Sequence, residues 1–276
     1  MLELKHSGLP LYINEQDYMM ALSGQLKLGG YARKNTDKMI GLLENEANLK
    51  PDDPFYDVYR DIYFPEDKAL LEKNHYQYDI TIVMPGTVNG ELKKTSGHFH
   101  GWNIEHTNTY GEVYEVLKGT ALYVLQKSPN FDADNPGDVQ IDDMILVTVH
   151  EGQIFLVPPN YGHASINIGE GPLIFSNLAY QKCPVLYEAV KFHHGMAVYV
   201  SREDGKISIQ MNRYYKNLPE IKYATLKENP HLGVVKGSPV YVSYQKDPDA
   251  FEFLGHPDDY VDEIMSMLEY HNELIM

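Results

Sequence analysis

Three histidines and one glutamate stand where a β-sheet protein could gather them around one metal ion. His98 and His100 are two residues apart, and residues i and i+2 of a strand point to the same face. Glu112 opens a second predicted strand, and His163 follows the Pro158–Pro159 turn that leads into a third. Three imidazoles and one carboxylate form a cage suited to Fe, Mn, Ni or Zn, with the remaining octahedral positions open to water or substrate. A lone His-x-His pair is weak evidence, because hydrogen-bonded surface histidines share this spacing, but the four residues together make a stronger pattern.

The elements expected to position these side chains are short β-strands. From about residue 76 the hydrophobic pattern alternates with a period of two, and Gly and Pro clusters interrupt it. Many short strands in succession predict an all-β sandwich or barrel. The predicted strands are 78–84, a run over 112–125, 144–148, 153–157, 164–168 and 173–178.

The hydrophobic pattern at the two ends of the chain differs from that of the central region. Two short helices are expected near the N-terminus, one capped by Asn14 and carrying Tyr18, Met19 and Leu22, the other capped by Thr36 and carrying Met39, Ile40 and Leu43. We expect extra strands at 196–201, 207–211 and 240–244, and then a closing helix capped by Asp258 or Asp259. Its apolar stripe of Val261, Ile264, Met265 and Leu268 would pack on the barrel or on a second subunit. The expected division is an arm over 1–75, a barrel over 76–215 and an extension over 216–276.

Composition excludes several classes of protein. Hydrophobic residues make up 43% of the 276 residues, which is a globular composition. The formal net charge of −16 argues against nucleic-acid binding. The single cysteine, Cys183, cannot form an intramolecular disulfide, and the chain has neither a secretory signal pattern nor an apolar stretch long enough for a membrane span. We therefore expect a soluble, cytoplasmic protein.

The order of the motifs resembles the two-part signature of the cupin family. The motifs are G-H-x-H at 97–100, E-x6-G at 112–119 and G-x5-P-x4-H-x3-N at 152–167. Thr-x-Gly-His-Phe-His, Glu-Val-Tyr followed by Leu-Lys-Gly, and Val-Pro-Pro narrow the resemblance to the cupin-type phosphoglucose isomerases of archaea and some bacteria. The resemblance implies a cupin double-stranded β-helix, a jelly-roll barrel, here with N-terminal helices and a C-terminal extension that ends in a helix.

The resemblance also implies roles for individual residues. The metal ligands would be His98, His100, Glu112 and His163. Glu112 would be the suspected base, and Tyr114 would orient the substrate or relay a proton. The sugar-phosphate pocket would be lined by Tyr56, Thr81, Thr95, the backbone of Gly97, Tyr114 and Tyr187, and by Tyr180 after a one-residue shift of the alignment.

Two departures from the family pattern stand out. The loop between His100 and Glu112 is longer than in the family, and it contains Glu105 at the shorter spacing common in other cupins. Glu112 is the favoured ligand because only it is followed by Val-Tyr and the x6-G spacing. The family's histidine before the last pocket tyrosine falls near Val185, and His193 or His194 could replace it from a neighbouring turn.

The implied function is a metal-dependent aldose–ketose isomerase that interconverts glucose 6-phosphate and fructose 6-phosphate through an enediolate or a hydride shift. It would use one divalent ion per subunit, Fe²⁺ in first place and otherwise Mn²⁺, Ni²⁺ or Zn²⁺. Neutral donors such as Thr81, Thr95 and Tyr56 would bind the phosphate. The alternatives are a sugar-phosphate-binding cupin without catalysis and a non-haem iron dioxygenase. Exposed edge strands and the C-terminal stripe suggest a homodimer, with neither nucleic acid nor membrane as a partner.

Overall fold

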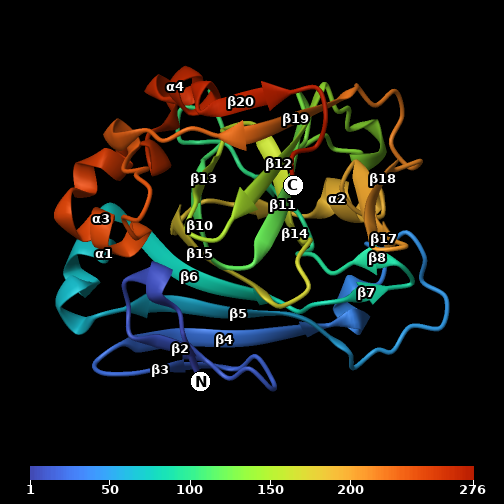
Figure 1. Cartoon of the computed structure of the whole chain (residues 1–276). Coiled ribbons are helices and arrows are strands. Elements are labelled where there is room, and N and C mark those ends of the chain that lie inside the picture. The colour runs from blue at the N-terminus through green and yellow to red at the C-terminus, as the bar shows by residue number, and fades with distance from the viewer.

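Antiparallel β-strands form most of the regular structure of the protein (Figure 1). The computed structural model describes all residues, 1–276. The larger sheet contains β4 (Lys27–Asn35), β5 (Pro54–Tyr63), β6 (Tyr76–Val83), β10 (Glu112–Lys118), β13 (Ile154–Val157) and β15 (Leu173–Tyr180). Its spatial order is β13-β10-β15-β6-β5-β4. The prediction of a mostly β fold is confirmed.

A second sheet of five strands packs against the first. It contains β11 (Thr120–Lys127), β12 (Asp143–His150), β14 (Tyr161–Asn167), β19 (Ile221–Leu226) and β20 (Leu268–His271), in the spatial order β14-β11-β12-β19-β20. β19 runs parallel to β12, whereas the other pairs in this sheet are antiparallel. The last part of the chain, orange to red at the top of Figure 1, thus adds two strands to the second sheet.

The remaining elements are short. The small strands are β1 (Leu2–Glu3), β2 (Leu11–Ile13), β3 (Met20–Leu22), β7 (Thr87–Val88), β8 (Glu91–Leu92), β9 (Phe99–His100), β16 (Val185–Leu186), β17 (Val198–Glu203) and β18 (Lys206–Met211). The α-helices are α1 (Lys68–Asn74), α2 (Glu188–Phe192), α3 (Val240–Lys246) and α4 (Val261–Ser266). The 3-10 helices are η1 (Lys5–Ser7), η2 (Thr36–Met39), η3 (Pro65–Asp67), η4 (Pro136–Asp138), η5 (Pro230–Leu232), η6 (Pro248–Leu254) and η7 (Pro257–Asp259). None of the helices has the length and apolar character needed to cross a lipid bilayer.

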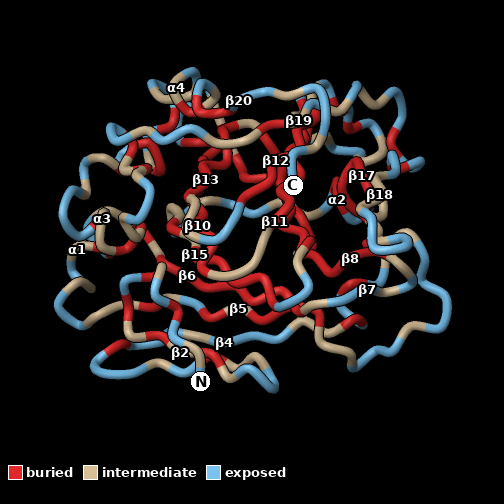
Figure 2. Tube along the Cα trace, in the orientation of Figure 1, coloured by how far each residue is buried: buried red, intermediate tan, exposed pale blue.

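The central strands of the six-stranded sheet are buried on both faces, whereas its edge strand β4 is largely exposed (Figure 2). On its inner face the ring of Tyr114 packs 5.2 Å from that of Tyr123 in the second sheet. On its outer face the ring of Tyr78 packs 5.1 Å from that of Tyr241 in α3. Alternate residues of β6 therefore face opposite sides of the sheet. Apolar side chains lie on the outer face, and the polar Thr81 and Asp79 lie on the inner face, where they line a cavity.

The predicted strands between residues 78 and 178 are confirmed, with one refinement. The long run over 112–125 is two strands, β10 and β11, which are separated at Gly119. Gly119 has φ +89°, and a Cβ there would lie 2.9 Å from the carbonyl oxygen of Pro172. Only glycine fits this turn without strain, because L side chains rarely adopt such a φ and the backbone leaves no space.

The predicted N-terminal helices are not present. Residues 11–22 form the hairpin β2–β3, in which Leu11 pairs with Leu22. Asn14 does not cap a helix; its Oδ1 accepts a 3.0 Å hydrogen bond from the amide of Gln16 and so stabilises the hairpin turn. Thr36 begins only the single turn of η2, and its hydroxyl donates to the carbonyl of Asp53 instead of capping the helix. Side chains that favour helix caps also favour turns, which explains the error at Asn14, whereas the hydroxyl of Thr36 is engaged by a residue distant in the chain.

Two predictions for the C-terminal extension are also wrong. Residues 240–244 lie in α3, directly after Pro239, and not in a strand. The chain does not end in a helix either, because α4 stops at Ser266 and is followed by β20, in which Leu268 pairs with Leu226 of β19. Backbone pairing with a strand that is distant in the sequence outweighs the local helical pattern here. Asp258 and Asp259 lie in η7 before α4, and neither caps a helix through its side chain.

Candidate metal centre and substrate cavity

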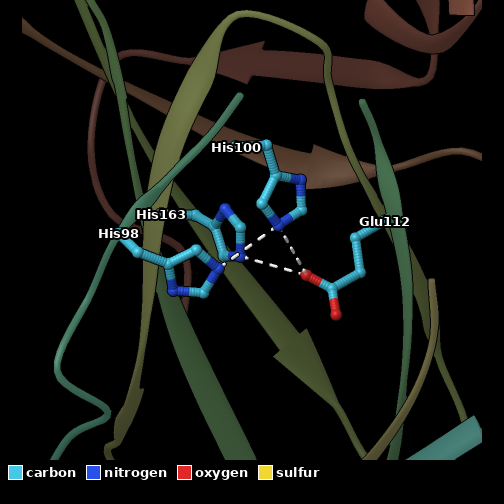
Figure 3. Close-up of side chains that lie close together, drawn as sticks. All are labelled: His98, His100, Glu112 and His163. Atoms are coloured by element: carbon cyan, nitrogen blue, oxygen red, sulfur yellow. Dashed lines mark hydrogen bonds and ion pairs between the residues drawn. The ribbon is translucent and has the colours of Figure 1, made fainter. Parts of the chain in front are cut away.

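Four side chains converge at one point on the inner side of the sheets (Figure 3). The Nε2 atoms of His98 and His100 are 3.2 Å apart. The Glu112 Oε2 atom lies 3.4 Å from Nε2 of His100 and 3.2 Å from Nε2 of His163. All four potential ligand atoms lie within 4.8 Å of one another, so the structure brings together the set that the sequence predicts as metal ligands.

Backbone pairing fixes the positions of the ligands. His98 and His163 form an antiparallel bridge in which each amide donates to the other's carbonyl, at 3.1 and 2.9 Å. Glu112 is the first residue of β10. Gly97 precedes the first ligand with φ +75°, and a Cβ there would lie 2.6 Å from Sδ of Met196. The close approach of this segment to its neighbours therefore requires a glycine at 97.

The donor set fits a divalent metal ion. Ligand atoms bound about 2.0–2.2 Å from one ion at tetrahedral or right angles lie roughly 3.0–3.5 Å from one another. The three distances of 3.2, 3.4 and 3.2 Å above fall in that range. Nδ1 of His100 lies 2.9 Å from the carbonyl oxygen of Tyr110, which leaves Nε2 free to face the cluster. Metal-binding histidines usually have such a partner on the second ring nitrogen.

Electrostatics favour the cation-binding protonation state at three of the four side chains, His98, His163 and Glu112. Burial, together with the neighbouring imidazoles, lowers the pKa of His98 well below its usual value. Burial also lowers the pKa of His163, although Glu112 opposes the shift. Burial would raise the pKa of Glu112, but hydrogen bonds with His100 and His163 outweigh it and hold that pKa well below its usual range. Neutral imidazoles at His98 and His163 beside an ionised Glu112 are the protonation states that metal binding requires. Although burial opposes the shift, Cys183 and Glu112 raise the pKa of His100 well above its usual value, so that imidazole releases a proton when a metal ion binds.

Two further side chains contact Glu112 from the inner face of the sheet. The Tyr114 hydroxyl donates a 2.9 Å hydrogen bond to Oε2 and lies 3.1 Å from Nε2 of His163. Nδ2 of Asn177, from the adjacent strand β15, donates a 2.7 Å hydrogen bond to Oε1. Both carboxylate oxygens therefore have partners, and the Asn177 contact has no counterpart among the sequence-based predictions.

The cluster opens into a cavity that contains every predicted substrate residue. His98, His100 and Glu112 line it at one place, and the other predicted residues that line it are Tyr56, Thr81, Thr95, Gly97, Tyr114, Tyr180 and Tyr187. The Tyr187 ring lies 5.6 Å from that of His98. The Tyr56 hydroxyl lies 3.0 Å from Oγ of Ser96, so hydroxyl groups gather beside the metal ligands.

Comparison with known proteins identifies the family. A family model for glucose-6-phosphate isomerase (GPI) matches residues 32–217, about two thirds of the chain. The chain belongs to the cupin-type glucose-6-phosphate isomerase family. The similar glucose-6-phosphate isomerase of Pyrococcus furiosus is 28% identical over 168 residues, which are 61% of this chain and 77% of that protein. The enzyme of Thermococcus kodakarensis is 27% identical over 191 residues, 67% of this chain and 86% of that protein.

The solved structures that resemble this chain have low sequence identities and low TM-scores. An oxalate oxidase is 17% identical with a TM-score of 0.29, and covers 41% of this chain and 46% of its own. An oxalate decarboxylase variant from Bacillus subtilis is 12% identical with a TM-score of 0.32, and covers 57% of this chain and 29% of its own. The description of the fold therefore rests on the strand pairing.

The resemblance predicts departures from the family pattern at the loop 101–111 and at Val185, and the structure places the residues concerned. Glu105 is exposed in that loop and is not part of the ligand cluster. Val185 lines the cavity opposite His100, to which it is paired in the β16–β9 ladder. His193 is buried against the ring of Tyr215 and lines a different cavity, and His194 stacks on Tyr214. Neither histidine lines the metal cavity, so the suggested replacement of the family's histidine is wrong.

Two cations in the cavity wall were missed by the sequence-based predictions. Lys34 Nζ donates a 3.3 Å hydrogen bond to Oγ of Ser96, lies 5.2 and 5.7 Å from the ring centres of Tyr56 and Tyr187, and has no carboxylate within ion-pair distance. Arg60 also lines the cavity, with NH1 3.5 Å from Oδ2 of Asp79. The alternation of Tyr56 and Val58 along β5 was the available signal that this segment is a strand. Its pairing with β4, which sets Lys34 opposite Tyr56, has no signal in the local sequence.

Proposed function

We propose that this protein is a metal-dependent isomerase that interconverts glucose 6-phosphate and fructose 6-phosphate. The observation that carries the proposal is the convergence of His98, His100, Glu112 and His163 at a polar cavity in a chain of this family. The chain covers most of the length of its glucose-6-phosphate isomerase relatives, which supports the extension of their activity to this protein.

The four clustered residues would hold one divalent metal ion per subunit. A set of imidazoles and one carboxylate suits Fe²⁺, Mn²⁺, Ni²⁺ and Zn²⁺. We infer Fe²⁺ as the first candidate and the other three as alternatives. Such an ion supplies Lewis-acid stabilisation of negative charge on the C1 and C2 oxygens of the sugar. The barrel that supports it would be a cupin double-stranded β-helix over 76–215, between the arm over 1–75 and the extension over 216–276.

Glu112 and Tyr114 are the groups placed to act on a proton or on a hydroxyl of the substrate. Burial and the neighbouring Glu112 raise the pKa of Tyr114 well above its usual value, so its phenol stays protonated near neutral pH and acts as a donor. Glu112 is the base in an enediolate route, although its lowered pKa makes it a weak one. A hydride shift between C1 and C2 would need no base for the carbon-bound hydrogen, but the proton of the C2 hydroxyl would still have to pass to the C1 oxygen. Isomerisation of glucose 6-phosphate deuterated at C2 separates the two routes, because deuterium lost to solvent indicates the enediolate, whereas a hydride shift keeps all of it at C1 of the product.

The phosphate group would bind at the Lys34 side of the cavity. Lys34 Nζ is near Oγ of Ser96, and Thr95 and the backbone of Gly97 line the same wall. An ammonium group that has no carboxylate partner can form charge-assisted hydrogen bonds with a phosphate oxygen. This local cation also explains how a chain with a formal net charge of −16 could bind an anionic substrate.

The decisive experiment is an assay that couples formation of glucose 6-phosphate from fructose 6-phosphate to a dehydrogenase. We expect activity in the metal-loaded protein, loss of activity after chelation and recovery on addition of Fe²⁺ or Mn²⁺. A metal-loaded protein that binds fructose 6-phosphate without converting it would overturn the proposal.

That outcome would instead support a sugar-phosphate-binding protein without catalysis. The observation that favours this alternative is Val185, which occupies the position expected for the family's histidine. A dioxygenase is less well supported, because polar side chains such as Gln77, Asp79 and Asn177 line the cavity beside Lys34. Oxygen uptake on addition of an organic substrate would identify that activity.

We propose a cytoplasmic homodimer as the working state. The C-terminal stripe does not argue for this state, because Ile264 and Leu268 are buried within the chain itself. The exposed edge strand β4, with Leu28 and Tyr31 exposed, is the better candidate for an interface. Light scattering after gel filtration gives the molecular mass and tests the dimer directly.

A further inference from the structure

The C-terminal extension contacts the loop 101–111 through one carboxylate. Asp258 Oδ1 accepts hydrogen bonds from Oγ1 of Thr107 at 2.6 Å and from Nδ2 of Asn108 at 2.8 Å. Nδ2 of Asn103 donates to both carboxylate oxygens at 3.0 Å. Asn103 is buried, so its amide would lack this acceptor if Asp258 were removed. The extension lies beyond residues 32–217, the part of the chain that matches the family model.

The same loop ends on a metal-ligand contact. The chain folds back so that Trp102 bridges to Thr109 and the amide of Asn103 donates to the carbonyl of Asn108. The carbonyl oxygen of Tyr110, at the end of this small hairpin, lies 2.9 Å from Nδ1 of His100. A shift of the hairpin therefore changes the orientation and the favoured tautomer of that imidazole.

The hairpin is also tied to the segment that carries His163. The Thr109 amide donates to Oδ1 of Asn160, and the amide of Asn160 donates to Oγ1 of Thr109. Nδ2 of Asn160 donates a 2.7 Å hydrogen bond to Oδ1 of Asn108. Asn160 is three residues before His163, so one hairpin contacts the supports of two ligands.

The extension also reaches the loop indirectly, through Tyr180 of β15. The Tyr110 ring stacks on that of Tyr180, with 4.8 Å between the ring centres. Gly255 of the extension packs beside the same tyrosine, because a Cβ at position 255 would lie 3.8 Å from the Tyr180 ring. Ring packing therefore accompanies the hydrogen bonds that connect Asp258 to His100 through the 101–111 loop.

We propose that the C-terminal extension acts as an outer support of the metal centre, and that Asp258 is the positioning residue that fixes the 101–111 hairpin and, through Tyr110, the imidazole of His100. This inference rests on the metal site of the proposed function and is independent of whether the protein isomerises a sugar.

The test is the affinity of the full-length apo protein for Co²⁺, measured by competition with a chromogenic chelator. We expect Asp258→Ala to weaken Co²⁺ binding about 10-fold, the lower end of the effect of outer partners of metal ligands. We also expect a changed visible absorption spectrum of the bound Co²⁺, which reports ligand geometry. The matched control is Asp259→Ala, which removes the same charge from the neighbouring exposed position and should bind Co²⁺ as the wild type does.

A second variant distinguishes the loss of the Asp258 contact from general damage to the fold. Thr107→Val removes one hydrogen bond to Asp258 and keeps the side-chain volume. We expect a smaller loss of Co²⁺ affinity, and no additional loss when it is combined with Asp258→Ala, because both act through one contact. Co²⁺ affinity and spectrum equal to wild type in either folded single variant would overturn the inference. A wild-type protein that binds Co²⁺ but lacks isomerase activity would refute only the proposed function.

Discussion

The amide of Asn177 donates a 2.7 Å hydrogen bond to Oε1 of Glu112, while Oε2 of the same carboxylate faces His100 and His163. Asn177 lies on β15 opposite Tyr114, the residue whose hydroxyl donates to Oε2. Two neighbouring strands thus hold both oxygens of the only carboxylate in the cluster. The orientation of that carboxylate depends on residues outside the ligand motif.

Replacement of Asn177 by leucine is expected to weaken metal binding. Oε1 of Glu112 would lose its half-buried donor. The carboxylate would then be free to turn away from the histidines, and affinity should fall about 10- to 100-fold. Competition with a chelator measures this change. Gln181→Leu is the control, because Gln181 lines the same cavity without contacting a ligand. Equal affinities in the two variants would contradict the prediction.

Replacement of His98 by alanine should remove one ligand, and metal affinity should fall by more than the roughly 100-fold upper limit for an outer partner. The metal content of the purified variant, measured by atomic absorption, should be far below one ion per chain. His150→Ala, at an exposed position away from the cluster, should keep the wild-type content. Full metal content in His98→Ala would show that the cluster is not the metal site.

Replacement of Lys34 by methionine should raise KM for fructose 6-phosphate and leave kcat nearly unchanged. A hydrogen bond to a charged group contributes about 1.5–3 kcal/mol, which corresponds to roughly a 10- to 100-fold change. Lys191→Met is the control, because Lys191 contacts the Tyr187 ring at 5.4 Å but does not line the cavity. If both variants keep the wild-type KM, the phosphate binds elsewhere.

Glu115 should make the protein less stable as the pH rises. It lies on the outer face of β10, where its carboxylate accepts a hydrogen bond from the amide of Val240. Burial raises its pKa from 4.5 to about 8, against the opposing effect of that hydrogen bond. Between these values the folded state holds a proton that the unfolded state has released, so the free energy of unfolding falls as the pH increases through this window.

The variant Glu115→Gln removes this titration and keeps an acceptor for the amide of Val240. At pH 8 we expect its stability to exceed that of the wild type by at least about 1 kcal/mol, or roughly 2–4 °C in Tm, and the gain should vanish near pH 4.5. Thermal unfolding followed by circular dichroism across this range measures the difference. Glu203→Gln, at an exposed position, should show no such trend. A constant difference between Glu115→Gln and wild type at every pH would refute the assignment.

The sequence was most informative where a feature depends on close neighbours in the chain. The period of two over β6 and β15 predicts their faces, because alternation is a property of each strand alone. His98 and His100 share a face for the same reason, and the Val-Tyr and x6-G pattern after Glu112 distinguishes it from Glu105. Helix caps were less informative, because the Asn14 side chain serves a turn as readily as a helix end.

By itself, the sequence determined a mostly β protein of the cupin-type isomerase family and the four residues that converge in the cluster. The tertiary structure decided that Lys34 enters the cavity, that Asn177 holds Glu112, and that Asp258 contacts the 101–111 loop. Each of these contacts joins residues that are between 62 and 155 positions apart in the chain. Such contacts depend on which strands pair and how the extension packs, and no local periodicity or spacing contains that information.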